Sequence, residues 1–312
     1  MNQLKSFDWQ IIVNPNALNK KRLSIQSQWL EELSRNGIHY KLWNANGAGQ
    51  GMALAEKLCR EGCRHLMVMG GDGSVNEVVN GIYRSEIPAN EMYLAILPLG
   101  TGNDFCRTFA YPKDKSKVVD FLLHNDFHPV DVGVVESVCE GRVVALRRFI
   151  NIAGFAFDAA VIRETVGAKP KIGASAVYLS KLLKVLFSYR PMSVTVHTEE
   201  EGDYTCEMFT IAVGNAQFNG NGMRQVPMAD PTDGLLDVVT IRKLSPLKVM
   251  ANVKNLFSGK HISLPEVKVF TTRSVEISSK HPIPGEVEGE MLVEGNYRIS
   301  LETLKINILG NI

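Results

Sequence analysis

The stretch from Met67 to Asn80 constrains the fold of this chain more than any other. An apolar run, Leu66 to Met69, predicts a buried strand that leads directly into Gly70-Gly71-Asp72-Gly73. Glycines here allow a left-handed backbone and the close approach of another group. A helix is predicted to follow at once, because apolar residues then recur at helical spacing, at Val75, Val78, Val79 and Ile82. A strand, a glycine turn and a helix N-terminus together offer free N–H groups and a positive dipole end to a phosphate.

A second turn of the same kind follows along the chain. Tyr93 to Leu97 is another apolar run, and Pro98 to Phe105, P-L-G-T-G-N-D-F, again ends in glycines and polar residues before a short helix. One such turn alone is common in α/β proteins, and the S-x-x-E pattern of Ser74 and Glu77 predicts a simple capping box at the first helix. Two turns at the ends of neighbouring parallel strands would face one crevice, which is the usual ligand position in such sheets.

The two turns carry a family resemblance. The segments G-G-D-G-S-V-N-E (70–77) and L-P-L-G-T-G-N-D-F-C-R (97–107) resemble the diacylglycerol kinase catalytic domain of bacterial lipid kinases, sphingosine kinases and ceramide kinase. Later segments extend the resemblance over nearly the whole chain, at 151–161, 213–215, 219–223 and 227–238. The resemblance implies an N-terminal three-layer α/β domain of the NAD kinase and phosphofructokinase type, followed by a C-terminal antiparallel β-sandwich-type domain.

The length of 312 residues also suggests two domains. Strands and helices alternate up to about His124, which favours a parallel α/β sheet. Beyond it, Glu140-Gly141 predicts a hairpin, and strands are expected at 195–197, 204–213, 234–241 and 267–277, interrupted by a helix at 246–257. We therefore place a nucleotide-binding domain at 1–128 and a β-rich domain at 129–306, with 307–312 returning to the first domain.

Composition narrows the function classes. A formal net charge of +1 does not favour nucleic-acid binding, and five cysteines without a paired framework indicate a reducing cytosol. Met1 to Asp8 lacks the apolar core of a signal peptide, and no window reaches the ~20 apolar residues of a membrane span. We expect a cytoplasmic protein that meets membranes peripherally, through the basic amphipathic helix at 174–190 or nearby loops, and leave a homodimer open.

The resemblance implies ATP as the nucleotide, held without a Walker lysine, since G-x-x-x-x-G-K-[ST] is absent. Backbone N–H groups of the first turn would hold the phosphates, so a side chain at Gly71 or Gly73 should abolish turnover. The expected nucleotide residues are Asn14, Asn44, Gly70, Gly71, Asp72, Gly73, Ser74, Val75, Asn76, Glu77, Gly100, Thr101 and Gly102.

The resemblance also implies two Mg²⁺ sites. Asp72, Asp104 and Asp131 would hold the catalytic ion, partly through water, although helix capping and a strand edge are the simpler interpretations of Asp104 and Asp131. Asp230, Asp233 and the Leu235 carbonyl would hold a structural ion, where the residues alone would indicate a plain turn.

The sequence departs from the family at two points. Leu18 replaces the glycine of N-P-x-x-G, and Glu288-Gly289-Glu290 stands where the family has Asp-Gly-Glu. The resemblance makes Glu288 the expected general base, with Glu290 as a supporting carboxylate. The leading hypothesis is ATP-dependent phosphorylation of a lipid hydroxyl, by default diacylglycerol to phosphatidic acid. An NAD kinase and a catalytically silent lipid- or nucleotide-binding protein are the alternatives.

Overall fold

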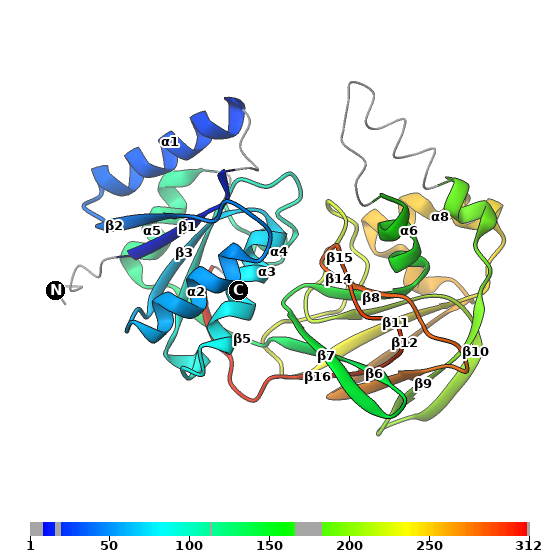
Figure 1. Cartoon of the computed structure of the whole chain (residues 1–312). Helices are drawn as coiled ribbons and strands as arrows, with labels where there is room; N and C mark the ends of the chain where they lie inside the picture. Colours follow the sequence, from blue (N-terminus) through cyan, green and yellow to red (C-terminus); the bar gives the residue numbers. More distant parts are fainter. Residues whose placement is uncertain (1–8, 16–19, 113, 166–182, 311–312) are drawn as a thin grey trace. The chain divides into compact units, whose positions relative to one another are not determined.

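The computed structural model describes residues 9–15, 20–112, 114–165 and 183–310 (Figure 1). The chain divides into two compact units. Unit 1 comprises Met1–Val132, Gly220–Gly222 and Glu302–Ile312, and unit 2 comprises Gly133–Asn219 and Met223–Leu301. An α/β unit is thus followed by a β-rich one, which confirms the predicted fold class.

Unit 1 is built on a six-stranded sheet of order β2-β1-β3-β4-β17-β5. All neighbours are parallel except β5, which runs antiparallel to β17. The central strands consist of apolar runs, because helices cover both faces of the sheet. The strands are β1 (Trp9–Val13), β2 (Tyr40–Asn44), β3 (His65–Gly70), β4 (Tyr93–Pro98), β5 (Phe127–Val130) and β17 (Ile306–Leu309).

The helices of unit 1 connect these strands. Trp29 and Leu33 of the first helix pack into a core with Met67, Met69 and Leu97 of the sheet. The last strand, β17, comes from the far end of the sequence and completes the sheet between β4 and β5. The helices are α1 (Lys20–Arg35), α2 (Gln50–Arg60), α3 (Asp72–Arg84), the short η2 (Ala89–Glu91), α4 (Asp104–Thr108) and α5 (Lys115–His124).

Unit 2 contains an eleven-stranded sheet in which every named pair is antiparallel. Its main path runs β15-β14-β8-β10-β9-β13-β16-β6-β7, and β11 joins β10 to β12. The strands are β6 (Gly133–Cys139), β7 (Arg142–Phe149), β8 (Ile152–Ala156), β9 (Met192–Thr198), β10 (Gly202–Gly214), β11 (Leu236–Arg242), β12 (Val267–Thr272), β13 (Ser274–Ser278), β14 (Gly285–Val287), β15 (Glu290–Met291) and β16 (Asn296–Leu301).

Two apolar clusters stabilise unit 2. One is centred on Phe149, Phe155 and Tyr297. The other, which we call the helix-side cluster, contains Phe157, Phe209, Val226 and Val239 and receives side chains from the helices. These helices are α6 (Phe157–Thr165), α8 (Pro246–Ser258) and the short η3 (Lys260–Ser263).

Of two local predictions for unit 2, the hairpin is confirmed and one strand is wrong. The hairpin at Glu140-Gly141 forms between β6 and β7, with both residues at positive φ, as a tight two-residue turn requires. The single strand expected over 267–277 is wrong. The chain changes partners at Arg273, so that β12 pairs with β11 while β13 pairs with β9 and β16.

The helix expected at 174–189 falls largely on residues 174–182, outside the described part, and residues 183–188 are helical. Val185 and Leu186 are buried there, in the helix-side cluster. Within the described residues, no helix is long and apolar enough to cross a membrane.

Candidate functional site

The carboxyl ends of four parallel strands bring the predicted nucleotide residues of unit 1 to one edge of the sheet. The register pairs Val13 with both Asn44 and Met69, and Gly70 with Pro98. Asn14, Asn44 and both glycine turns therefore lie at the same edge. This is the edge at which open α/β sheets bind ligands.

The two glycine turns pack directly against each other. A Cβ placed on Gly71 would lie 2.9 Å from the Cα of Gly100, and one on Gly100 would lie 2.5 Å from the Cα of Gly71. A Cβ on Gly70 would lie 2.5 Å from the side chain of Ser74. Close backbone packing therefore requires glycine at positions 71 and 100, and the Ser74 side chain leaves no room for a Cβ at position 70.

The glycines of the first turn were expected to have a left-handed backbone, and this expectation is wrong. Gly73 also differs from the others in its surroundings. None of Gly70, Gly71 and Gly73 has a positive φ, because Gly71 is extended and α3 begins already at Asp72. A Cβ on Gly73 would meet no atom within 4 Å. The protein itself thus leaves open space above the first turn of α3, next to the N–H groups that have no partner inside the helix.

The second turn is held by Asn103, which precedes α4 in a left-handed conformation. Its side-chain amide accepts a hydrogen bond from Gly100 N (3.0 Å) and donates one to Gly100 O (3.1 Å). The adjacent Thr101 Oγ1 accepts a hydrogen bond of 2.7 Å from Nη2 of Arg22, on α1. Arg22 thus brings a cation to the turn, and its signal was the basic run after Asn14-Pro15.

The capping box predicted for Ser74 and Glu77 does not form. The helix begins three residues earlier, with Gly71 in place of Ser74 at the N-cap, so Glu77 lies in its second turn, too far from the N-terminus to cap it. Instead, the Glu77 carboxylate accepts hydrogen bonds from Gly49 N (2.9 Å) and Gly51 N (2.8 Å). Glu77 therefore satisfies the N-terminal amides of α2 and joins that helix to α3.

The other predicted residues of α3 are largely enclosed. Val75 and Asn76 are buried, and the side chain of Asn80 donates to both the carbonyl and the side-chain oxygen of Asn76. At Val75 and Asn76, therefore, only the backbone is suited to contact a ligand in the described structure. Ser74 is half-buried and Gly73 is exposed.

Asp72 and Asp104 converge beside Gly102. A Cβ on Gly102 would lie 3.1 Å from Asp72 Oδ2 and 3.3 Å from Asp104 Oδ2. Asp72 Oδ1 accepts from Phe105 N (3.1 Å), at the start of α4, and Asp104 Oδ2 accepts from Asn221 N (2.8 Å). Each carboxylate is thus anchored through one oxygen atom.

The electrostatics of this pair disfavour two negative charges side by side. Burial raises the pKa of Asp104, and the charge of Asp72 raises it further, against the backbone amides of Asn221 and Gly222. Asp104 Oδ1 is buried and has no hydrogen-bond partner among the described residues, and Arg107 Nε lies 3.3 Å away. Two converging carboxylates with a buried oxygen atom to spare are a donor set that fits Mg²⁺, which takes few carboxylates and keeps several waters.

Asp131 is positioned differently from the other two expected ligands. It is buried, and Nζ of Lys305 lies 2.9 Å from its Oδ2. No group of three or more His, Cys, Asp or Glu side chains within the described ranges is arranged to hold a metal. The structure therefore brings Asp72 and Asp104 together and gives Asp131 a lysine partner.

The turn expected to hold a structural ion lies in unit 2. Asp230 Oδ1 accepts from the N–H and hydroxyl of Thr232 (2.9 and 2.7 Å), and Asp233 Oδ1 accepts from Leu235 N (2.9 Å). Burial raises the pKa of Asp237, with smaller contributions from Asp233 and Asp230. Sequence reasoning missed Asp237, although it follows in the same D-x-x-D-G-L-L-D run.

Glu288 occupies the tight turn between β14 and β15. Glu288 and Gly289 both have positive φ, and the Glu288 Oε1 atom accepts from Ile150 N (2.7 Å) and Asn151 N (2.8 Å). The carboxylate is thus fixed by two backbone amides in the link between β7 and β8. Glu290, in contrast, is exposed.

A pair of acidic side chains, the buried Glu286 and the half-buried Asp158, adjoins this turn, and sequence reasoning missed it. Glu286 Oε2 accepts from Gly289 N (2.7 Å), and the side chain of Gln225 donates to Asp158. Burial raises the pKa of Glu286 to about 8 and that of Asp158 to about 6. The side chains fit there because residue 154 is glycine. A Cβ at that position would lie 2.6 Å from Glu286 Oε1 and 3.0 Å from Asp158 Cβ.

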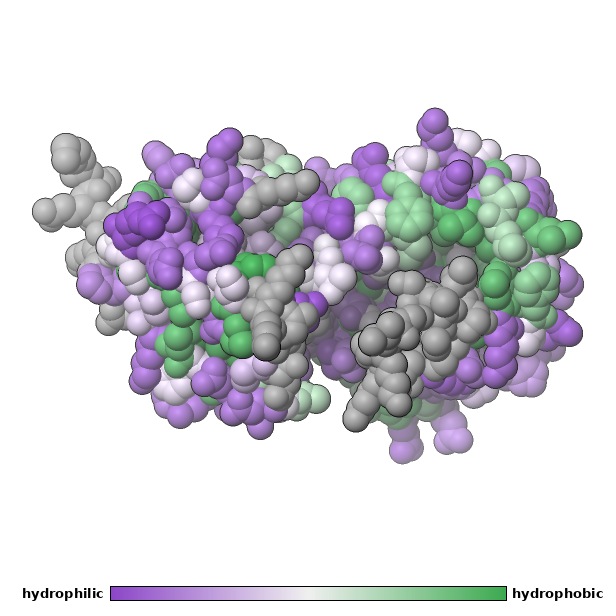
Figure 2. All heavy atoms as spheres, turned by 90° about the horizontal axis from the view of Figure 1, so that it is seen from above, coloured by the Kyte–Doolittle hydropathy of each residue, from purple (hydrophilic) through white to green (hydrophobic). Residues whose placement is uncertain are grey.

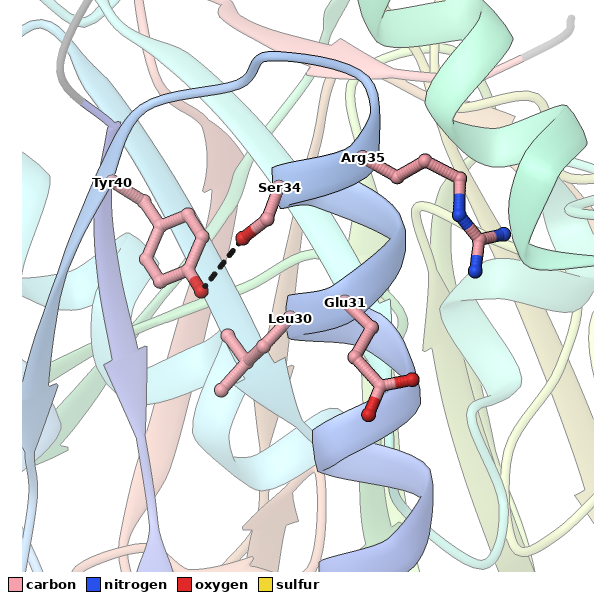
Figure 3. Close-up of a pocket in the computed structure, with 5 residues that line it drawn as sticks. All are labelled: Leu30, Glu31, Ser34, Arg35 and Tyr40. Atoms are coloured by element: carbon pink, nitrogen blue, oxygen red, sulfur yellow. Dashed lines mark hydrogen bonds between the residues drawn. The ribbon is translucent and has the colours of Figure 1, made fainter.

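The hollow drawn in Figure 3 is a separate feature of unit 1. It has a volume of about 580 Å³ and is lined by Leu30, Glu31, Ser34, Arg35 and Tyr40. Ser34 and Tyr40 point toward each other, with their hydroxyls 3.3 Å apart, whereas Arg35 points away (Figure 3). Tyr40 begins β2, so this hollow lies at the sheet edge opposite the glycine turns and contains no predicted residue.

Comparisons with known proteins match most of both units. The model of the diacylglycerol kinase catalytic domain matches residues 8–135, and that of the YegS C-terminal NAD kinase beta sandwich-like domain matches residues 152–310. A diacylglycerol kinase of Staphylococcus carnosus is 29% identical over 90% of this chain and 88% of its own. A "Probable lipid kinase YegS-like" of Chromohalobacter salexigens is 28% identical over 81% of this chain and 78% of its own.

Solved structures show the same fold. A diacylglycerol kinase from Bacillus anthracis superposes with a TM-score of 0.70 at 18% identity, covering 97% of both chains. Yeast NADH kinase, solved with NADH, superposes with a TM-score of 0.53 at 10% identity, covering 99% of this chain and 85% of its own.

Proposed function

We propose that this chain, which belongs to the lipid kinase family that joins a diacylglycerol kinase catalytic domain to a YegS-type C-terminal domain, transfers the γ-phosphate of ATP to a lipid hydroxyl. Diacylglycerol is the proposed acceptor and phosphatidic acid the product. The observation that carries the proposal is the pair of interlocked glycine turns beside the converging carboxylates Asp72 and Asp104.

Phosphate binding follows from the first turn. The N–H groups at the start of α3 point out of the helix, the helix dipole favours negative charge there, and Gly73 leaves the approach open. The Asn103 amide and the packing of Gly71 on Gly100 fix the second turn in place. Phosphoryl transfer needs mainly such positioning and electrostatic stabilisation, so a rigid cradle is the appropriate device.

Asp72 and Asp104 are the proposed ligands of the catalytic Mg²⁺. Bound there, the ion would neutralise charge that develops on the transferred phosphoryl group. Asp131 could join these ligands only if its ion pair with Lys305 were broken. We therefore propose that Asp131 supports the site through its charge. The turn with Asp230, Asp233 and the Leu235 carbonyl is the proposed structural ion site, since all its donors are oxygen atoms.

Glu288 is the proposed general base. Its carboxylate is the group at the family's base position, and the amides of Ile150 and Asn151 hold Oε1, which orients the side chain. Glu290 lies two residues further, exposed, and is proposed to support this turn without taking the proton.

The experiment is a transfer assay with radiolabelled ATP and Mg²⁺ on the full-length chain. Diacylglycerol, a sphingoid base, phosphatidylglycerol, a polyprenol and NAD are offered in parallel. We expect label in the diacylglycerol lane, whereas label in NAD would establish the NAD kinase alternative. No label in any lane, with ATP bound, would favour a silent binding protein.

The matched control is Asp72→Asn. Asparagine retains an oxygen acceptor for Phe105 N, so the start of α4 keeps its hydrogen bond while the charge is lost. Equal labelling by this variant would mean that a contaminating kinase, or a different site, produces the signal.

A further inference from the structure

Helix α8 has apolar side chains on two of its faces. On the inner face, Val249 packs against the helix-side cluster of unit 2, and the Leu256 carbonyl accepts a hydrogen bond of 2.8 Å from Arg224 N. On the outer face the exposed fractions are 73% for Leu247, 46% for Met250, 38% for Val253 and 52% for Phe257. A surface helix normally has a single apolar face that is turned toward the core, so this second, exposed apolar face of α8 is unusual.

The outer residues form one stripe. Leu247, Met250, Val253 and Phe257 are spaced by three, three and four residues, which keeps them on one side of a helix of 3.6 residues per turn. In Figure 2 hydrophobic side chains gather on unit 2 where α8 lies in Figure 1. A contiguous exposed apolar patch of this kind marks an interaction site.

The positive charge around the stripe indicates an anionic partner. The segment 238–265, which contains α8, has five basic residues, Arg242, Lys243, Lys248, Lys254 and Lys260, and no aspartate or glutamate. In a chain of net charge +1 this is a strong local excess. Glu207 pairs with Lys243 and Glu266 with Lys248, whereas no salt bridge in the described part of the chain involves Lys254, which lies beside the stripe.

We infer that the outer face of α8 is the surface on which this protein docks to an anionic phospholipid bilayer. Its apolar stripe would lie at the boundary between headgroups and acyl chains, and Lys254 and Lys260 would meet the anionic headgroups. The inference rests on the proposed function in one respect only: a lipid acceptor is reached at a membrane.

A second, smaller observation agrees with this assignment. Phe187 is 55% exposed, while its neighbours Val185 and Leu186 are buried in the same helix-side cluster on which α8 packs. The described helical residues 183–188 therefore expose a large apolar side chain on the part of unit 2 that also carries α8.

The test is co-sedimentation with vesicles of phosphatidylcholine alone and of phosphatidylcholine with phosphatidylglycerol. The wild-type chain should bind the anionic vesicles more tightly, and binding should weaken as salt is added. Leu247→Gln combined with Phe257→Gln should weaken binding to both vesicles at least tenfold. Lys254→Glu should weaken it on anionic vesicles alone, by roughly fivefold to thirtyfold.

The matched control uses another exposed helix, α5 of unit 1. Leu123→Gln and Lys117→Glu remove an exposed leucine and an exposed lysine there, so they should leave vesicle binding unchanged. Equal binding by the α8 double variant and the wild type would overturn the inference. So would a wild-type chain that binds neither vesicle, or a double variant that changes only the oligomeric state, which would identify a second copy as the occupant.

Kinase activity separates this inference from the proposed function. With diacylglycerol in detergent micelles, the α8 double variant should retain wild-type activity, while its activity on the same lipid in vesicles should fall in parallel with binding. Vesicle binding through α8 without transfer to any lipid would refute the proposed reaction and leave the docking surface intact.

Discussion

Gly73 offers the sharpest separation of ligand binding from folding. A Cβ there meets no atom within 4 Å, its φ is not positive, and it lies in the first turn of α3. Alanine is better than glycine inside a helix by roughly 0.5–1 kcal/mol. Gly73→Ala should therefore unfold at the same temperature as the parent or up to about 4 °C higher.

Nucleotide binding should change in the opposite direction. The methyl group of Gly73→Ala would occupy the space through which a phosphate approaches the N-terminal amides of α3, and we expect ATP affinity to fall at least tenfold. Isothermal titration with ATP measures this, and thermal unfolding of the same sample shows that the fold is intact.

Gly71→Ala and Gly100→Ala serve as the comparison. Their Cβ atoms would lie 2.9 and 2.5 Å from backbone Cα atoms of the facing turn, so we expect each to destabilise unit 1 by about 1–3 kcal/mol. Unchanged ATP affinity in a stable Gly73→Ala variant would refute the phosphate cradle at α3.

Three further outcomes are expected. Glu288→Gln retains an oxygen that can accept from the Ile150 and Asn151 amides, so it should lower kcat about 100-fold or more with ATP binding intact, whereas Glu290→Gln should do less. Glu286 keeps its proton up to a pKa of about 8 when folded but loses it near 4.5 when unfolded, so stability should decline as pH rises through that window. In urea unfolding at pH 5, 6.5 and 8, Glu286→Gln should flatten this decline. Glu77→Ala should lower the stability of unit 1 by about 1–3 kcal/mol in thermal unfolding, because two amides at the start of α2 lose their acceptor.

The strand, turn and helix units of unit 1 could be predicted because their signals are local. Apolar runs such as Leu66 to Met69 form strands that are buried on both faces, and the helical spacing of the apolar residues after Gly73 predicts α3. The paired turns could likewise be placed at one sheet edge, since parallel strands end together. This much required no knowledge of contacts between distant residues.

What could not be predicted depends on distant partners. Glu77 follows a capping pattern in sequence, yet α2, arriving from 26 residues away, takes its carboxylate. Asp131 meets Lys305 across 174 residues, which no local pattern reveals. The acid pair of Glu286 and Asp158 is of the same kind, because its raised pKa values come mainly from burial among segments that are distant in the sequence.

The Mg²⁺ dependence of lipid phosphorylation by Asp104→Asn tests the central claim most directly. Asparagine keeps an acceptor for Asn221 N, so the site geometry is preserved while one of the two converging charges is removed. With the preferred lipid acceptor and saturating ATP, the account predicts a loss of rate of at least 100-fold together with a higher Mg²⁺ requirement. A variant that phosphorylates the lipid at the parental rate and at the parental Mg²⁺ concentration would contradict it.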